Sequence, residues 1–385
     1  MLLLASKVKV AVMQILKLSS VVPNDAYTTE ELIEAFPCRL PDGVRQNVLN
    51  TGVRKRHLLT AASSRLSGGN EIANGGFTDL CTQACEEAIC HADLSARDVD
   101  YLVATYDANP LLSPGLSYVL VPRLGLNRFV KHVSAQGVAS TAMPKALETA
   151  RNYLAAHPTD RVLVCISGMS SFWFQNQARG LKGVLEIEQI NKINDEAERR
   201  MELRKWVAVM QSFLFGDGVS AAVLANEPQR GLTVKGIVEV SNVGVKDYTA
   251  GYSRLVATDE PFTYGFWSHL DREIPDLGAQ YTGLALTQLL GKEKDEIVRK
   301  ARKWAVHTGS GKILQRIAEQ HSIPPEKLSE SHEVLRDHGN LAGASLPFIL
   351  ERIMSRGNLS KGDLVLMVGY GWGFTAAAST LEHIG

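Results

Sequence analysis

Buried-strand patterns separated by amphipathic helices constrain the fold of this chain most strongly. Short apolar runs of strand length occur at 8–13, 101–106, 161–167, 220–226, 232–241, 303–308 and 363–370. Longer stretches with helical periodicity occur among them, at 77–92, 139–156, 279–290, 311–320 and 342–356. Strands that are apolar on both faces and alternate with helices are typical of layered α/β folds. An α/β architecture is therefore expected.

The order of these elements suggests two similar halves. In each half a helix with a distinctive residue near its start, Val138 or Asn340, precedes an apolar strand. A Pro- and Gly-containing connection at 226–231 separates the halves, so we expect units at 1–230 and 231–385. A charged stretch at 175–211 has helical spacing of apolar residues and predicts a helical insertion. A solvated arm, a dimer contact, a carrier-protein docking surface and a lid are all open for it.

Composition narrows the class of protein. Lys+Arg and Asp+Glu each total 41 among 385 residues, so no excess positive charge favours nucleic acid or an anionic membrane. No apolar run is long enough to span a bilayer. The five cysteines lack C-x-x-C spacing, and the pair Cys81 and Cys85 has no second pair to complete a metal site. We expect a cytoplasmic protein with reduced thiols, no metal and no nucleic-acid or membrane partner.

Polar and glycine-rich motifs are concentrated in the second part of the chain. His307 lies in WAVHTGSGKIL and Asn340 in HGNLAGASLPFIL, while FGDG occupies 215–218 and VGYGWG occupies 368–373. Two further segments accompany them: GVRKRHL at 52–58 and LSPGLSYVLVPRLGLNRFVKHV at 112–133. Several such motifs in one order are far more specific than any one alone.

In this order the motifs resemble those of the beta-ketoacyl synthase III and chalcone synthase group of the thiolase superfamily. The resemblance covers most of the chain apart from 175–211 and parts of 240–280. It implies a five-layer αβαβα fold of two duplicated halves and a homodimer. It also implies acyl-CoA or acyl-carrier-protein thioesters as substrates, with coenzyme A or phosphopantetheine as the carrier and no permanently bound cofactor.

Members of this family use a cysteine, a histidine and an asparagine. The resemblance assigns His307 and Asn340 to the pair that holds a carbonyl oxygen and stabilises an enolate. Taken alone, His307 could be a buried core histidine and Asn340 a helix N-cap. Their joint occurrence in family order favours a shared catalytic pocket.

The cysteine position departs from the family pattern. Matched through Gln136-Gly137, it falls on Val138, which has no lone pair and cannot form a thioester. Cys165 lies inside an apolar strand and is expected to be inert core. Ser134, Ser140 and Thr141 flank the position, but at this offset a serine side chain is expected to point elsewhere.

Other residues are assigned to substrate binding. The resemblance places Phe215 at the entrance between tunnel and cavity, although core packing beside FGDG is an equal alternative. Gly371 and Gly373 resemble the loop that shapes the family cavity and offers a backbone N–H to the thioester. Arg54 and Arg56 are candidates for contact with the phosphate of the carrier, with a solvated basic turn as the alternative.

Three functions remain open at this stage. The first is an acyltransferase in which His307 and Asn340 polarise a thioester or stabilise an enolate without an acyl-cysteine. The second is a catalytically incomplete subunit in a heterodimer with a cysteine-containing paralogue. The third is an engineered Cys-to-Val variant of an ordinary ketoacyl synthase III-like enzyme. We expect the first, in the biosynthesis of a polyketide or fatty-acid-derived metabolite.

Overall fold

A nine-stranded sheet organises the protein, in the order β11-β12-β13-β8-β1-β7-β6-β4-β5. The computed structural model describes residues 12–59, 76–107, 113–169, 174, 178, 180–227, 230–244, 249–257 and 264–385. The sheet strands are β1 (Gln14–Val21), β4 (Tyr101–Tyr106), β5 (Lys131–Gln136), β6 (Val162–Ser167), β7 (Val219–Ala225), β8 (Leu232–Ser241), β11 (Lys303–Val306), β12 (Leu364–Gly371) and β13 (Thr375–His383). Two small antiparallel pairs stand apart: β2 (Ala26–Thr28) with β3 (Lys55–His57), and β9 (Gly251–Ala257) with β10 (Tyr264–Leu270).

Helices cover both faces of this sheet. The longer ones are α5 (Gly76–His91), α6 (Leu116–Arg123), α7 (Ala142–Ala156), α10 (Glu196–Leu214), α12 (Ile274–Leu290), α14 (Gly311–His321), α15 (Ser329–His338) and α16 (Ser345–Ser355). The shorter ones are α1 (Thr29–Glu34), α2 (Asp42–Leu49), α9 (Ile187–Ile190) and α13 (Lys294–Lys300). Single 3-10 turns are η1 (Ala96–Asp98), η2 (Ala139–Thr141), η3 (Gly291–Glu293), η4 (Pro325–Lys327) and η5 (Ala342–Ala344).

The sheet divides into two parts that are joined at one narrow seam. Strands β5, β4, β6, β7 and β1 form one part, and β8, β13, β12 and β11 form the other. Between them, β1 and β8 share two register pairs within the described residues, Gln14 with Thr233 and Ile15 with Leu232. A seam this short lets the two parts turn away from each other, so that helices can pack between them.

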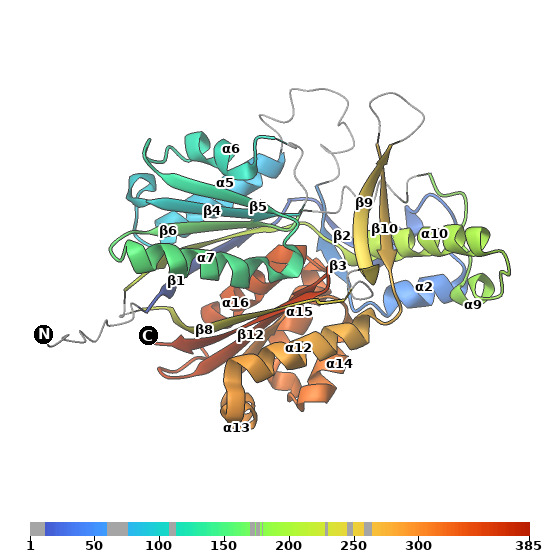
Figure 1. Cartoon of the computed structure of the whole chain (residues 1–385). Coiled ribbons are helices and arrows are strands. Elements are labelled where there is room, and N and C mark those ends of the chain that lie inside the picture. The colour runs from blue at the N-terminus through green and yellow to red at the C-terminus, as the bar shows by residue number, and fades with distance from the viewer. Residues whose placement is uncertain are drawn as a thin grey trace, which may run out of the picture.

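Five layers result, as Figure 1 shows. The first core cluster lies in the middle layer and combines apolar residues of α7 and α16 with residues from both parts of the sheet. The second cluster joins α5 and α6 to the outer face of the β4–β7 part. The third joins α12 and α14 to the outer face of the β11–β13 part. The expected αβαβα fold of two similar halves is thus confirmed.

A smaller cap stands beside these layers. Apolar residues of α2 and α10 form a separate cluster, which includes Val44, Val48, Val209 and Phe213. Figure 1 shows α2, α9, α10 and the β9–β10 pair together on one side of the layered core. The predicted insertion at 175–211 accordingly contributes α9 and most of α10. Its function stays a prediction.

The N-terminal part of the sheet differs from expectation. A strand was expected at 8–13, but residues 8–11 lie outside the described part, and β1 comprises Gln14–Val21. Lys17 is the exposed residue of a strand that is otherwise mostly buried between β7 and β8. The predicted boundary at 230–231 falls between β7 and β8, and separate folding of the two units stays a prediction. No helix in the described ranges has the length and apolarity needed to cross a membrane.

Candidate active site

His307 lies directly after β11, where the strand enters the interior. Its backbone N–H donates to Val368 O of the neighbouring β12 at 3.0 Å, and its residue surface is 2% exposed. The Tyr370 hydroxyl donates to His307 O at 3.1 Å, and the two rings meet edge to face at 5.2 Å between centroids. The imidazole is therefore held by the strand pair that carries it.

Ser140 is the partner of this histidine. Its Oγ lies 2.8 Å from His307 Nε2, and both residues are buried. Ser140 belongs to η2, the turn that joins β5 to α7. The sheet and the middle helix layer thus bring a hydroxyl and an imidazole into hydrogen-bond contact from opposite halves of the chain.

Burial determines the charge of the imidazole. Desolvation lowers the pKa of His307 to about 3, so the ring is neutral near pH 7. Nδ1 is buried without a hydrogen-bond partner. When the proton resides on Nδ1, Nε2 can accept the hydrogen bond of the Ser140 hydroxyl. In that state the neutral ring presents a lone pair to the serine proton.

Asn340 lies in the turn between α15 and α16. Its backbone forms an isolated bridge with Phe215, in which Asn340 N donates to Leu214 O and Gly216 N donates to Asn340 O. Its Oδ1 accepts the N–H of Ala342 at 2.8 Å, which fixes the orientation of the amide. No residue in the described ranges accepts from its Nδ2 group. That donor is available to a substrate oxygen.

The turns that carry Ser140 and Asn340 pack directly against each other. A Cβ placed on Gly343 would lie 2.8 Å from Ala142 Cβ and 3.2 Å from Ala139 O, closer than ordinary packing permits. Ala139 and Ala342 each have φ of 47°, a left-handed conformation that costs an alanine about 1 kcal/mol or more. The two halves therefore present matching strained turns at one place.

The glycine-rich end of β12 forms a third side of the site. A Cβ on Gly371 would lie 2.9 Å from Ala139 Cβ and 3.2 Å from Ser140 N. Glycine at this position allows the backbone to approach the Ser140 turn. Gly373 has φ of 119° in the turn between β12 and β13, and a Cβ there would meet nothing within 4 Å. Gly371 borders the serine, whereas Gly373 serves the turn.

An aromatic cluster borders the asparagine. Phe215 stacks on Phe174 with ring centroids 4.2 Å apart, and both pack with Ala342. Trp372 and Leu214 lie at the edge of this cluster. Phe215, predicted to bind substrate, is thus beside the Asn340 turn, and its side chain is in an apolar environment.

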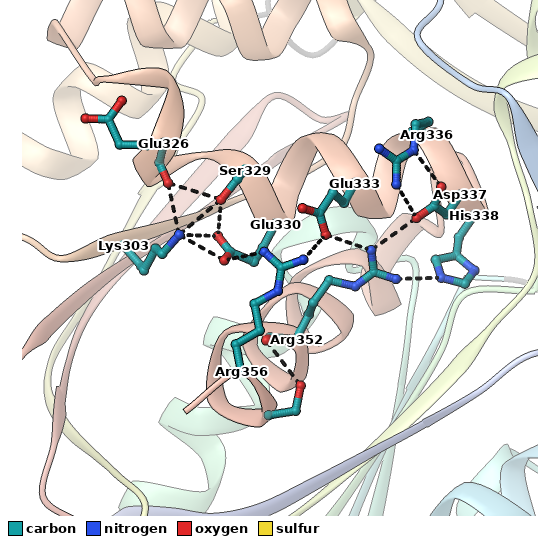
Figure 2. Close-up of polar contacts among 11 residues, drawn as sticks. Lys303, Glu326, Ser329, Glu330, Glu333, Arg336, Asp337, His338, Arg352 and Arg356 are labelled. Atoms are coloured by element: carbon teal, nitrogen blue, oxygen red, sulfur yellow. Dashed lines mark hydrogen bonds and ion pairs between the residues drawn. The ribbon is translucent and has the colours of Figure 1, made fainter. Parts of the chain in front are cut away.

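Ion pairs anchor the helices on both sides of Asn340, as Figure 2 shows. Arg352 of α16 bonds Glu333 and Asp337 of α15 at 3.2 Å each and donates to His338 Nε2 at 3.3 Å. Glu330, with a side chain 1% exposed, pairs with Lys303 of β11 and Arg356 of α16. This network ties the strand that precedes His307 to the helices around Asn340.

The charge state of Glu330 follows from these partners. Burial raises the pKa of the carboxyl, but hydrogen bonds from Lys303 and Ser329 outweigh burial, and the pKa is lowered overall. Removing one partner of a buried ion pair costs about 3–5 kcal/mol, because the other charge stays buried. The network is therefore expected to be structural, and none of its members contacts Ser140 or His307.

The side chain that contacts His307 is not at the position expected from the sequence. Val138, expected beside His307, is half-buried and packs at the edge of the first core cluster. Ser140, expected to point elsewhere, makes the contact instead. Counting from the start of α7, rather than from Gln136-Gly137, would have selected Ser140, because the buried helix positions Met143, Ala146 and Leu147 fix where the turn ends. Cys165 is fully buried in β6, as expected.

The two arginines assigned to phosphate binding have different environments. Arg54 is exposed and lies 3.9 Å from Glu30, so it is accessible to a ligand. Arg56 is 0% exposed, and its guanidinium lies over the Phe213 ring at 5.5 Å from the centroid. Burial lowers the pKa of Arg56 to about 9. Because side chains alternate along β3, Arg56 points inward, and its predicted contact with an external phosphate is wrong for this conformation.

The described residues include no group of three or more His, Cys, Asp or Glu side chains arranged to hold a metal ion. All five cysteines are free thiols.

Comparison with known proteins shows which protein families this chain resembles. Residues 299–383, which contain His307 and Asn340, match the family described as 3-oxoacyl-[acyl-carrier-protein] synthase III, C terminal. The 1,3,6,8-tetrahydroxynaphthalene synthase of Streptomyces coelicolor is 23% identical over 374 residues, which cover 93% of this chain and 89% of that protein. The beta-ketoacyl-[acyl-carrier-protein] synthase III of Clostridium perfringens is 24% identical over 313 residues, covering 79% and 84%. These matches support the assignment of the chain to the condensing enzymes of the thiolase superfamily.

Solved structures of condensing enzymes have the same fold. The crystal structure of the Streptomyces coelicolor tetrahydroxynaphthalene synthase has a TM-score of 0.78 at 20% identity and covers 97% of this chain and 99% of that one. A variant of Xanthomonas campestris OleA, with bound lauric acid and lauroyl-CoA, has a TM-score of 0.71 at 19% identity and covers 96% and 99%. The predicted fold is confirmed for this condensing-enzyme homologue.

Proposed function

We propose that this condensing-enzyme homologue is an acyltransferase that uses Ser140 as its nucleophile. The observation that carries the proposal is the 2.8 Å contact between Ser140 Oγ and His307 Nε2 in a buried site. A hydroxyl is a weak nucleophile on its own, and an adjacent base within hydrogen-bond reach is the usual means of activating it. The acyl group would thus be held as a serine ester, without an acyl-cysteine.

The chemical steps follow from this geometry. His307 Nε2 accepts the proton of the Ser140 hydroxyl while Oγ attacks the thioester carbonyl carbon. The tetrahedral intermediate collapses, the carbon–sulfur bond breaks, and the proton on Nε2 passes to the leaving thiolate. An acceptor nucleophile then attacks the ester and loses its proton to His307. The ester bond to Oγ breaks, the proton on Nε2 passes to Oγ, and both Ser140 and His307 are regenerated. General base catalysis of this kind contributes about 10²–10⁴ in rate.

Asn340 is proposed to bind the carbonyl oxygen. Its Oδ1 is occupied by the Ala342 N–H, so its Nδ2 group is directed away from the turn as a hydrogen-bond donor. A fixed donor stabilises the negative charge that develops on the oxygen in the transition state. The same donor would stabilise an enolate oxygen if a malonyl-type unit were decarboxylated. Asn340 therefore supports either reaction of a thioester.

The proposed substrates are acyl thioesters of coenzyme A or of an acyl carrier protein. The names of the relatives support this class, because one is a synthase acting with acyl carrier protein and another forms a polyketide-type naphthalene. Arg54 is exposed and can approach a carrier phosphate. Phe215 and Phe174 give the Asn340 side of the site an apolar wall that suits an uncharged acyl group.

We propose that two copies of the chain form a homodimer through the edge of the sheet that ends in β5. Strand β5 is the last in the order and pairs, within the described residues, with β4 only. Phe129 and Tyr118 flank this edge with 85% and 62% of their surfaces exposed. Two copies of β5 could continue the sheet and cover these side chains. Light scattering of the wild type and of Phe129→Lys measures the oligomeric state. A monomeric wild type would reject the proposed homodimer.

Three variants test the proposed nucleophile. Ser140→Ala should abolish transfer from an acyl-CoA panel, and Ser140→Cys should retain acylation because a thiol at this position keeps its base. Val138→Cys is the matched control, since it places a thiol two residues away in the same turn, and it should gain no acylation at residue 138. Full activity of Ser140→Ala would reject the proposal and favour direct transfer, whereas an inactive wild type would reject it and favour a non-catalytic partner role.

A further inference from the structure

Asp107 contacts the turn that carries Ser140 but takes no part in the chemical steps proposed above. It follows β4 directly, at the carboxyl end of the parallel strands β4, β5 and β6. Its Oδ1 accepts the N–H of Ala139 at 3.0 Å. The carboxyl also accepts the N–H of Gly343. One side chain therefore bonds the turn that carries Ser140 and the turn that follows Asn340.

These two hydrogen bonds act on strained backbone. Ala139 precedes Ser140 and has φ of 47°, and Ala342 precedes Gly343 and has the same φ. The first N–H groups of a helical turn have no partner within the helix and need an external acceptor. A carboxylate is a strong acceptor for such groups. Asp107 satisfies one N–H in each turn and so offsets part of the conformational cost.

The orientation of Ser140 depends on the same turn. The Ala139–Ser140 peptide sets the directions of both the Ser140 N–H and its side chain, which reaches His307. Gly371 and Gly343 pack so closely against η2 that a methyl group on either would collide with it. In this arrangement, displacement of η2 would alter the distance between the hydroxyl and the imidazole.

We propose that Asp107 is a positioning residue, which holds the Ser140 turn against the Asn340 turn so that nucleophile, base and amide donor share one geometry. The proposal rests on the proposed role of Ser140. Burial raises the pKa of Asp107 to about 6, while the Ala139 and Gly343 N–H groups act in the opposite direction. The backbone donors on two separate elements favour the charged form of this carboxyl.

The test compares Asp107→Ala and Asp107→Asn with the wild type. Asp107→Ala removes both acceptors, whereas Asp107→Asn keeps one oxygen. Asp100→Ala is a matched control, because Asp100 lies at the opposite end of β4 and its Oδ2 accepts the backbone N–H of Arg161 at 2.9 Å. The rate of ester formation at Ser140 with an acyl-CoA is followed by mass spectrometry, and the thermal midpoint is recorded for each variant.

A loss of about 100-fold in acylation rate is expected for Asp107→Ala, since a misplacement of about 1 Å can have this effect. Asp107→Asn should recover much of the acylation rate. Asp100→Ala should acylate at the wild-type rate, although its thermal midpoint should fall about as far as that of Asp107→Ala. Acylation by folded Asp107→Ala at the wild-type rate would overturn the proposal. If Asp107→Ala does not fold, the acylation rate of folded Asp107→Asn decides the test. Either a wild-type rate or a complete loss of acylation in Asp107→Asn would overturn the proposal.

A second readout separates this proposal from the proposed function. In a Ser140→Cys background, the introduced thiol is alkylated with iodoacetamide, and its rate reports the pairing with His307 without any substrate. Adding Asp107→Ala should slow alkylation, whereas adding Asp100→Ala should leave it unchanged. If the wild type forms no ester but Asp107→Ala still slows alkylation, the proposed function fails and the positioning role stands. An unchanged alkylation rate contradicts the positioning role.

Discussion

Ser140 and His307 lie 167 positions apart in the chain, yet their Oγ and Nε2 atoms are 2.8 Å from each other inside the protein. The contact joins the turn before a middle-layer helix to the end of a strand in the opposite half. Each residue comes from one of the two similar halves, so the site exists only where the halves meet. This relationship is the basis of the predictions that follow.

Replacing His307 by alanine should remove the base from the site. We expect kcat for acyl transfer to fall by about 10²–10⁴ with little change in KM, because the imidazole acts on the proton and not on substrate affinity. Steady-state kinetics with an acyl-CoA measure this. His332→Ala is the control, because His332 is exposed on α15 and should retain activity. An active His307→Ala enzyme would contradict the assignment.

The structural and the chemical roles of Asn340 can be tested separately. Asn340→Asp keeps an oxygen for the Ala342 N–H but replaces the amide donor, whereas Asn340→Ala removes both. We expect Asn340→Asp to stay folded and lose about 10²–10³ in kcat, the effect typical of losing one donor to a developing oxyanion. Circular dichroism and kinetics measure the two parts. Equal activity in Asn340→Asp and the wild type would exclude a donor role.

Gly371→Ala should disturb the nucleophile through packing. The new methyl group would lie 2.9 Å from Ala139 Cβ and 3.2 Å from Ser140 N, so the turn has to move. We expect slower acylation of Ser140 and a loss of about 1–3 kcal/mol in stability. Gly278→Ala is the control, because its nearest contact is an ordinary 3.4 Å to Tyr370. Unchanged acylation in Gly371→Ala would show that the turn tolerates displacement.

Acid should destabilise the fold in part through His307. Burial lowers the pKa of His307 to about 3 from an ordinary value of 6.5, so the unfolded state binds more protons below pH 6.5. The contribution is present above that pH and is lost as pH falls toward 3. The loss of stability amounts to about 2 kcal/mol at pH 5.

Denaturant unfolding of the wild type and His307→Gln at pH 8 and pH 5 measures this contribution. The comparison is needed because burial also lowers the pKa of His321 and His338 to about 4. The wild type should lose more stability than His307→Gln between the two values. Equal losses would show that His307 is not buried as described.

Periodicity and motif order were sufficient to predict the layered fold, whereas the roles of His307 and Asn340 stay predictions. Strands buried on both faces and helices with one apolar face leave few alternatives to α/β layers, and the structure has that architecture. The expected first strand at 8–13 lies mostly outside the described residues, and the neighbouring Gln14–Val21 segment forms β1.

The contact with Ser140 was harder to predict because it depends on a shift of two residues from Val138. Gln136-Gly137 suggested Val138, but the chain continues through Ala139 in a left-handed conformation before Ser140 turns inward. Periodicity does not report such a conformation at an alanine. Asp107 was missed for a related reason, since its two N–H partners come from segments far apart in the sequence.

The most direct test is to find where the acyl group becomes attached. Wild-type protein is incubated with an acyl-CoA panel, quenched in acid, digested and analysed by tandem mass spectrometry, with Ser140→Ala in parallel. We predict a mass increase equal to one acyl group on Ser140, absent from Ser140→Ala and greatly reduced in His307→Ala. An adduct on another residue, or transfer that continues in Ser140→Ala, would contradict the account.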